Sequence, residues 1–268
     1  MWNKTQSSPG RGGGPPEGRW RGRAASGGPP PSASACHLLV PGRIGWFVLA
    51  LLLTACSAEP AQPQFPKAQR DVAPIVSDSF STEDARDRVG EAEQVMEIAG
   101  IKPGMWVADV GAGEGYYTVR LARMVGPRGR VLAEDIVPEV HDALGERVQR
   151  EGFENVAVKL GTPDNPLLPR QSFDRIFLVH MYHEVESPYA FLWHMREGLK
   201  PGGLAVVVDS DRPTGRHGIP PAQLKCEFAA LGLQPVISRV LTGGDAYLMA
   251  FRNVRDRPVP GAIRPCKS

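Results

Sequence analysis

The chain has 268 residues, enough for one domain with a segment to spare. Its formal net charge is +2, from 31 Lys and Arg residues against 29 Asp and Glu residues. Residues 1–55 hold six basic residues and one acidic residue, so the remainder has 25 basic and 28 acidic residues and a net charge of −3. No basic stripe remains in that remainder, and we expect no nucleic-acid partner.

Residues 1–42 form a low-complexity segment at the start of the chain. Eight glycines and six prolines fall within residues 1–35, and apolar residues recur there with neither a helical nor a strand period. Such a segment buries too little apolar surface to offset the entropy of ordering it. We therefore expect it to be disordered, or to arise from an upstream start codon.

Residues 43–56 have the pattern of a lipoprotein signal sequence. Arg43 precedes an apolar run at 44–53 that only one glycine interrupts. At about 1.5 Å per helical residue this run spans about half of a hydrocarbon core, which suits a signal h-region better than a transmembrane helix. Leu-Thr-Ala-Cys at its end resembles a bacterial lipobox, which implies that Cys56 is lipidated and anchors the protein to a membrane of the cell envelope. The alternative is a short apolar helix docked on the domain, and the protein is then cytoplasmic.

The rest of the chain divides into a Pro- and Ala-rich tether at 57–79, a domain at 80–253 and a C-terminal tail at 254–268. Within the domain we expect helices over residues 81–99, 117–124, 139–149, 190–199 and 221–231, and strands over residues 105–110, 131–133, 156–160, 173–179, 204–208, 235–241 and 246–251. Strands separated by helices indicate parallel βαβ units. The last two strands are joined by a short turn, which indicates an antiparallel hairpin. The fold class is thus α/β, a doubly wound, mostly parallel seven-stranded sheet that ends in a hairpin.

A glycine-rich turn follows the first expected strand. The spacing is Asp109-x-Gly111-x-Gly113-x-Gly115, and Tyr116 stands where the dinucleotide fingerprint requires its last glycine. This departure argues against a nicotinamide oxidoreductase. The pattern resembles motif I of the class I S-adenosylmethionine-dependent methyltransferases, and that resemblance extends over about residues 85–252.

The resemblance implies S-adenosylmethionine as the cofactor. Asp109 would favour the positively charged methionine end of this ligand, and the glycines would let the backbone pass beneath it. Asp135, at the end of the second strand, is preferred to Glu134 as the acceptor for the ribose hydroxyls. Asp164 either accepts a hydrogen bond from the adenine amino group or belongs to a simple Pro-Asp-Asn-Pro turn.

The segment after the fourth strand is expected to face the methyl acceptor. His180 and His183 are the candidate catalytic bases, with Tyr182 and Glu184 beside them. The alternative is that these histidines form a hydrogen-bonded pocket wall. Two histidines next to a glutamate also suggest a metal, but the sequence offers no further ligand cluster, and no metal is expected.

A second polar group follows the fifth strand. Arg212, Arg216 and His217 either bind an anionic acceptor or order a long loop. Cys226 is expected to be a small buried residue of its helix. Cys266 is expected to lie in a mobile tail, although an oxidising compartment would allow the two cysteines to pair.

The sequence thus predicts an S-adenosylmethionine-dependent methyltransferase that acts on a small-molecule or envelope acceptor. Methyl transfer from a sulfonium needs mainly alignment, so the absence of an obvious acid–base pair does not argue against an enzyme. The alternative is an envelope-tethered, non-catalytic S-adenosylmethionine-binding or sensory protein. An export signal favours this alternative, because S-adenosylmethionine is made in the cytoplasm.

Overall fold

The computed structural model describes residues 63–75 and 82–267. The predicted low-complexity segment and the predicted lipobox with Cys56 lie outside the described residues. No helix in the described part of the chain is long and apolar enough to cross a membrane.

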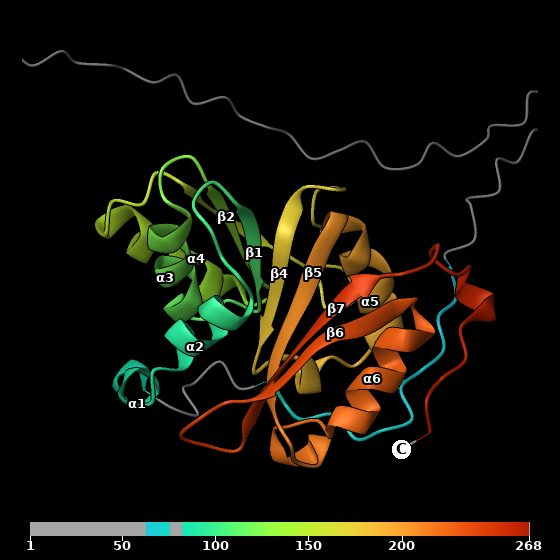
Figure 1. The fold of residues 1–268 in the computed structure, drawn as a ribbon. Helices are drawn as coiled ribbons and strands as arrows, with labels where there is room; N and C mark the ends of the chain where they lie inside the picture. Colours follow the sequence, from blue (N-terminus) through green and yellow to red (C-terminus); the bar gives the residue numbers. More distant parts are fainter. Residues whose placement is uncertain (1–62, 76–81, 268) are drawn as a thin grey trace, which may run out of the picture. The chain divides into compact units, whose positions relative to one another are not determined.

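The centre of the domain is a twisted sheet of seven strands in the order β3-β2-β1-β4-β5-β7-β6 (Figure 1). All neighbours are parallel up to β5, and β7 runs antiparallel to both β5 and β6. The predicted mostly parallel sheet with a C-terminal hairpin is confirmed. The strands are β1 (Trp106–Val110), β2 (Arg130–Asp135), β3 (Val156–Leu160), β4 (Phe173–Val179), β5 (Leu199–Ser210), β6 (Leu233–Val240) and β7 (Ala246–Asn253).

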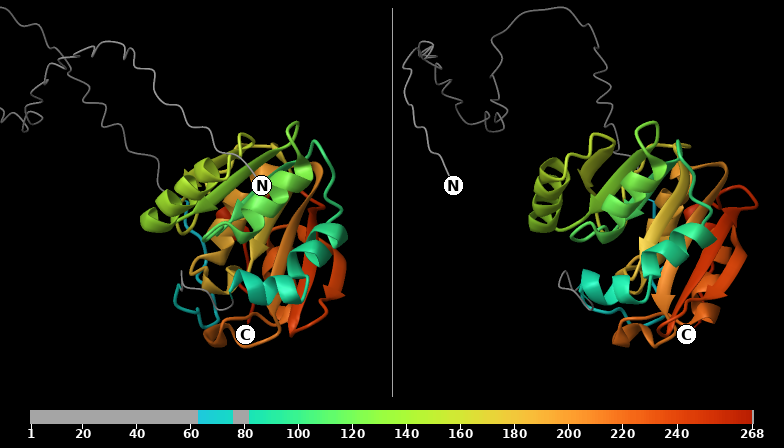
Figure 2. Two further views of the ribbon diagram at one scale, coloured as in Figure 1. Left: turned by 90° about the vertical axis from the view of Figure 1, so that its left-hand side faces the viewer. Right: turned by 60° about the vertical axis from the view of Figure 1, so that its left-hand side comes forward.

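Helices cover both faces of the sheet. Figures 1 and 2 show α2, α3 and α4 on one face and α5 and α6 on the other. The helices are α1 (Glu83–Arg88), α2 (Glu91–Ile98), α3 (Tyr116–Val125), α4 (Pro138–Arg150), α5 (Pro188–Met195) and α6 (Pro221–Ala230). Short 3-10 turns are η1 (Tyr182–Glu184), η2 (Arg196–Gly198), η3 (Thr214–Arg216) and η4 (Pro260–Ala262).

The side chains of β4 alternate between two apolar layers. Phe177 belongs to the layer that contains Leu121 of α3, and Leu178 belongs to the opposite layer with Leu192 of α5. All four side chains are fully buried. This period-two alternation fixes the register of the central strand, because a shift by one residue would exchange the two faces.

The helix predicted over residues 81–99 is divided into α1 and α2. Gly90 separates them with a left-handed backbone at φ 62° and ψ 35°. The apolar residues on either side keep one helical period through Gly90. The sequence pattern therefore predicted one continuous helix. As a result, α1 turns toward the carboxyl ends of the strands and contributes to the cavity described below.

Residues 63–75, which were expected to belong to an extended tether, lie against the domain. The guanidinium of Arg70 forms an ion pair with Glu227 of α6, at 2.9 Å between Nε and Oε1, and both side chains are almost completely buried. The Ala73 amide also donates to the carbonyl oxygen of His183. This part of the predicted tether therefore reaches η1, the turn that carries His183.

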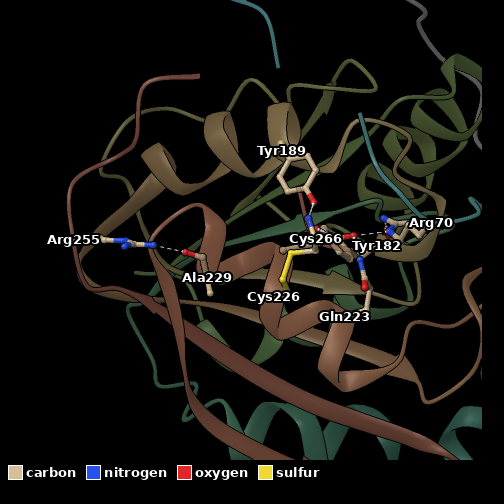
Figure 3. Close-up of a disulfide and its surroundings, with 9 residues drawn as sticks. Arg70, Tyr182, Tyr189, Gln223, Cys226, Ala229, Arg255 and Cys266 are labelled. Carbon is tan, nitrogen blue, oxygen red and sulfur yellow. Dashed lines mark hydrogen bonds and ion pairs between the residues drawn. A yellow bond between two sulfur atoms is a disulfide. The ribbon is translucent and has the colours of Figure 1, made fainter. Parts of the chain in front are cut away.

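The C-terminal segment is also attached to the domain. Cys226 of α6 and Cys266 form a disulfide (Figure 3). The Cys266 amide donates a hydrogen bond to the hydroxyl oxygen of Tyr189, and Ile263 is buried nearby in the core. The expectations of a buried, unpaired Cys226 and a mobile Cys266 were wrong. Cys226 lies on the exposed side of α6, where its sulfur can reach the returning chain.

Candidate functional site

A cavity of about 570 Å³ opens where the carboxyl ends of β1, β4 and β5 meet. Five parts of the chain form its walls: the loop after β1, the turn after β4, the segment after β5, the β6–β7 turn, and α1 with the start of α2. The volume lies within the roughly 300–1,000 Å³ of small-molecule sites. A second hollow of about 600 Å³ runs along α4 and contacts none of the predicted acceptor-side histidines.

The loop from Gly111 to Glu114 forms the floor of this cavity. Gly111 and Gly113 both have left-handed φ angles, 67° and 55°. A Cβ atom at Gly111 would come within 2.8 Å of the Met181 side chain, whereas one at Gly113 would point into open space. The loop thus presents bare backbone to the cavity at the position predicted for the cofactor.

Asp109 lies beneath this loop and does not line the cavity. Its carboxylate is 2% exposed and accepts a hydrogen bond from the Thr118 hydroxyl at 2.6 Å. Burial raises the pKa of this carboxyl to about 6, and the hydrogen bond from Thr118 acts in the opposite direction. In this structure Asp109 therefore ties the first turn of α3 to the end of β1 and makes no direct contact with the cavity.

Asp135 has a similar supporting position. Its carboxylate oxygens accept hydrogen bonds from the amides of Gly113 and Val137, each at 3.0 Å. It therefore connects the glycine-rich loop to the end of β2. Gly115 ends the loop directly before α3, where a Cβ atom would lie 2.4 Å from Leu144.

Asp164 is exposed and lies outside the cavity. Thr162 and Asn165 pair with each other through both backbone groups, and the Thr162 hydroxyl donates to the Asp164 carboxylate. The turn interpretation of this segment therefore describes its structure. The contact with adenine stays a prediction.

Glu134, the neighbour not chosen from the sequence, is the more unusual carboxyl. It is 2% exposed and packs against Gly161, and its Oε1 has no hydrogen-bond partner among the described residues. Burial raises the pKa of this carboxyl to about 8, and the nearby Asp135 carboxylate acts in the same direction. The folded protein therefore holds a protonated Glu134 at neutral pH.

We expect Glu134 to make the protein less stable as the pH rises. Its pKa is about 8 in the folded state against a usual 4.5, so the folded state binds one more proton between these values. Stability then falls across this window by up to about 1.4 kcal/mol per pH unit. Glu134→Gln should remove that dependence in urea unfolding at about pH 5, 7 and 8.5. Exposed Glu139→Gln is the control, and a parallel decline in all three proteins would refute the assignment.

A charged cluster from the first two helices forms another wall. Glu91 accepts hydrogen bonds from Arg86, at 2.6 Å, and from the Tyr117 hydroxyl, and it lies 3.3 Å from Nε2 of His180. Burial raises the pKa of Glu91, but the contacts with His180 and Arg86 outweigh it and lower that pKa to about 2. The sequence analysis missed Arg86 and Glu91, because on one continuous helix they would have been ordinary surface charges.

The predicted acceptor-side histidines both line the cavity. His180 contacts Glu91, whereas Nδ1 of His183 lies 3.0 Å from both carboxylate oxygens of Asp209. His183 and Asp209 are buried, with 3% and 0% of their surface exposed. His217 reaches the same wall from η3, and its ring centroid lies 5.5 Å from that of His183.

The two arginines of the second polar group have different surroundings from those of His217. Arg212 lines the cavity but forms an ion pair with Asp245 of the β6–β7 turn. Arg216 is exposed and is not part of the wall. The structure therefore favours a loop-ordering role for Arg212. His180 and His217 both have positive φ angles, 53° and 54°, which side chains rarely adopt.

Comparison with known proteins supports the resemblance seen in motif I. Residues 107–203 match a family model described as a methyltransferase domain. This part of the chain is thus similar to a methyltransferase domain. It includes β1, the glycine-rich loop and the turn that carries the two predicted histidines.

Two curated relatives show how far this similarity extends. The chain is 31% identical over 119 residues to a protein-L-isoaspartate O-methyltransferase of Ignicoccus hospitalis and spans 54% of that protein. It is 25% identical over 165 residues to a ubiquinone/menaquinone biosynthesis C-methyltransferase of Teredinibacter turnerae and spans 65% of it. The similarity thus covers 44% and 61% of this chain, respectively.

Solved structures confirm the fold of the methyltransferase domain. A S-adenosylmethionine-dependent methyltransferase from Aquifex aeolicus superposes with a TM-score of 0.60 at 26% identity, covering 63% of this chain and 93% of that one. The cyclase SpnF superposes with a TM-score of 0.56 at 15% identity, covering 70% and 100%. The fold is that of the class I methyltransferases, whose cofactor is S-adenosylmethionine.

Proposed function

We propose that the protein is an S-adenosylmethionine-dependent methyltransferase that acts on a small-molecule acceptor. The observation that carries this proposal is the cavity between the glycine-rich loop and the histidine wall. Its floor matches the cofactor motif, and its far wall holds polar groups able to position an acceptor. The cavity is of small-molecule size, and the net negative charge of residues 56–268 argues against nucleic acid.

The residues of the cavity fit S-adenosylmethionine. Bare backbone at Gly113 leaves room for a ligand to lie on the loop. Arg86 and Glu91 place a guanidinium and a carboxylate in one wall, which suits the carboxylate and ammonium of the methionine end. When bound, the cofactor supplies an electrophilic methyl group on a sulfonium.

The acceptor would lie against His180, His183 and His217. Buried Asp209 holds the imidazole of His183 in one orientation, so this wall can position a polar acceptor group. Alignment of the attacking atom with the methyl carbon and the sulfur accounts for most of the catalysis expected here. The named acceptors of the two curated relatives differ, and the chain spans only part of each, so neither is carried over.

Calorimetric titration of the full chain with S-adenosylmethionine tests the proposal. Gly113→Ala places a methyl group in the open space above the loop and should weaken binding by more than about tenfold. Gly152→Ala is the matched control, because Gly152 also has a positive φ of 72° and open space around it, but lies at the end of α4. Equal weakening by both variants, or no binding by the wild type, would refute the cofactor assignment.

We also propose that Cys56 carries a lipid that anchors the protein in the cell envelope. The order of charge, apolar run, small residues and cysteine supports this assignment, and the Cys226–Cys266 disulfide suits an oxidising compartment. Metabolic labelling with a fatty acid should mark the wild type and leave Cys56→Ala unlabelled. Equal labelling of both, or none of the wild type, would exclude this anchor.

A further inference from the structure

Three side chains with metal-binding atoms converge in the acceptor wall of the cavity. His183 and Glu184 come from η1, after β4, and His217 comes from the segment after β5. One ligand atom from each lies within 4.8 Å of the other two, and Nε2 of His183 is 3.9 Å from a carboxylate oxygen of Glu184. The sequence suggested His180, His183 and Glu184 as a metal cluster, and it missed His217 because that residue is distant along the chain.

The orientation of His183 is set by a buried carboxylate. Asp209 is completely buried, and both of its oxygens lie 3.0 Å from Nδ1 of His183. The neutral imidazole then donates its Nδ1 hydrogen to Asp209 and keeps the lone pair on Nε2, the atom nearest Glu184. A carboxylate behind a histidine in this way is the usual support of a metal-bound imidazole.

The spacing of the three groups also suits a metal ion. Bonds of about 2.0–2.2 Å from a metal to imidazole nitrogen and carboxylate oxygen place the ligand atoms about 3–4 Å apart. The atoms of His183 and Glu184 already lie within this range, and small side-chain rotations would bring His217 into it. Two imidazoles with one carboxylate are a donor set for divalent transition metals, and such a set leaves positions open for other ligands.

The backbone around His217 brings this residue back to the end of β5. The Ile219 amide donates to the carbonyl oxygen of Ser210, so the loop closes directly after His217. A Cβ atom at Gly218 would lie 2.6 Å from that same oxygen, which shows how closely the chain returns. His217 itself has φ 54° and ψ 62°. A tight return of the chain therefore holds this side chain beside His183.

We propose that His183, Glu184 and His217 bind one divalent transition-metal ion, with Asp209 as the positioning residue of His183. The ion would lie in the wall of the cavity, where it can bind an oxygen of the acceptor. This catalytic role, unlike metal binding itself, rests on the proposed function. A hydroxyl group of the acceptor bound there would lose its proton to water, its oxygen would form a bond to the methyl carbon of the cofactor, and the C–S bond would break with its electron pair left on sulfur.

A competing interpretation gives His183 and Asp209 a metal-free role. In that case His183 is a base oriented by Asp209, or a hydrogen-bonded part of the wall. Only the metal site predicts saturable metal binding that depends on His217. They also differ in the response of the protein to a chelator.

Cobalt binding to the full chain, after removal of metals with a chelator, distinguishes them. We expect Co²⁺ to give saturable visible absorption, and Zn²⁺ to displace it. Asp209→Asn should weaken this binding about 10–100-fold, and His217→Gln should weaken it more. His180→Gln is the matched control, because His180 lines the same cavity outside the cluster, and it should change the affinity less than about threefold.

Circular dichroism of each variant checks that the fold is retained. Absence of a saturable cobalt spectrum, or a spectrum that His217→Gln leaves unchanged, overturns the metal site and favours the metal-free role. The titrations contain no S-adenosylmethionine, so they are independent of the proposed function. A protein that binds the cofactor but not cobalt refutes only this inference, and one that binds cobalt but not the cofactor refutes the proposed function.

Discussion

Replacing Arg70 by methionine is expected to lower the free energy of unfolding by about 3–5 kcal/mol. Nε of Arg70 lies 2.9 Å from Oε1 of Glu227, and their side chains are 2% and 0% exposed. Arg70→Met would leave the carboxylate buried with hydrogen bonds only from neutral groups, the Tyr182 hydroxyl and the Gln223 amide. The cost comes mainly from this uncompensated charge.

Urea unfolding of the wild type and the variant measures this loss. Arg123→Met is the control, because it removes an exposed ion pair with Glu151, and it should cost less than about 1 kcal/mol. Adding Glu227→Gln to Arg70→Met removes the buried charge and should recover much of the stability. Equal costs for the two arginine variants would contradict this account.

Opening the Cys226–Cys266 disulfide is expected to have the second largest effect. The bond closes a loop with a sequence separation of 40 residues. Restricting the unfolded chain in this way contributes about 2–4 kcal/mol. The Cys226→Ser and Cys266→Ser double variant should lose this amount, because the C-terminal segment that packs at Tyr189 is then held only by weaker contacts.

Unfolding with and without a reductant supplies the control. The wild type in reductant should resemble the double variant, and the double variant itself should not respond to the reductant. If reduction leaves the stability of the wild type unchanged, the C-terminal segment is held by its packing and the disulfide contributes little.

The positions of the strands along the chain were predictable because each strand of the central sheet has its own apolar signal. The limits of β3 and β4 are the same in the sequence analysis and in the structure. Both strands are short, mainly apolar segments bounded by turn residues, a pattern that depends only on local sequence. The break at Gly90 was missed because the apolar period continues through it.

Sequence reasoning brought residues to both sides of the cavity, but it did not separate the residues that line the cavity from those that support it. Gly111 and Gly113 lie where motif I implies, since adjacent positions in one loop define that motif. Asp109 and Asp135 lie nearby, but their hydrogen bonds go to the start of α3 and to the loop, and sequence alone cannot separate that role from ligand contact. His217 was found only as part of a polar loop, because its position next to His183 depends on the pairing of β4 with β5.

The positive φ angles of His180 and His217 carry a cost in stability. A left-handed backbone costs a residue with a Cβ atom about 1–2 kcal/mol, and glycine avoids that cost. Among the described residues, Leu167 and Gln171 also have positive φ angles, but they lie outside the cavity, whereas His180 and His217 share one of its walls. The cavity wall therefore carries two imidazoles at points where glycine would avoid this backbone cost, and strain of this kind is often found at functional sites.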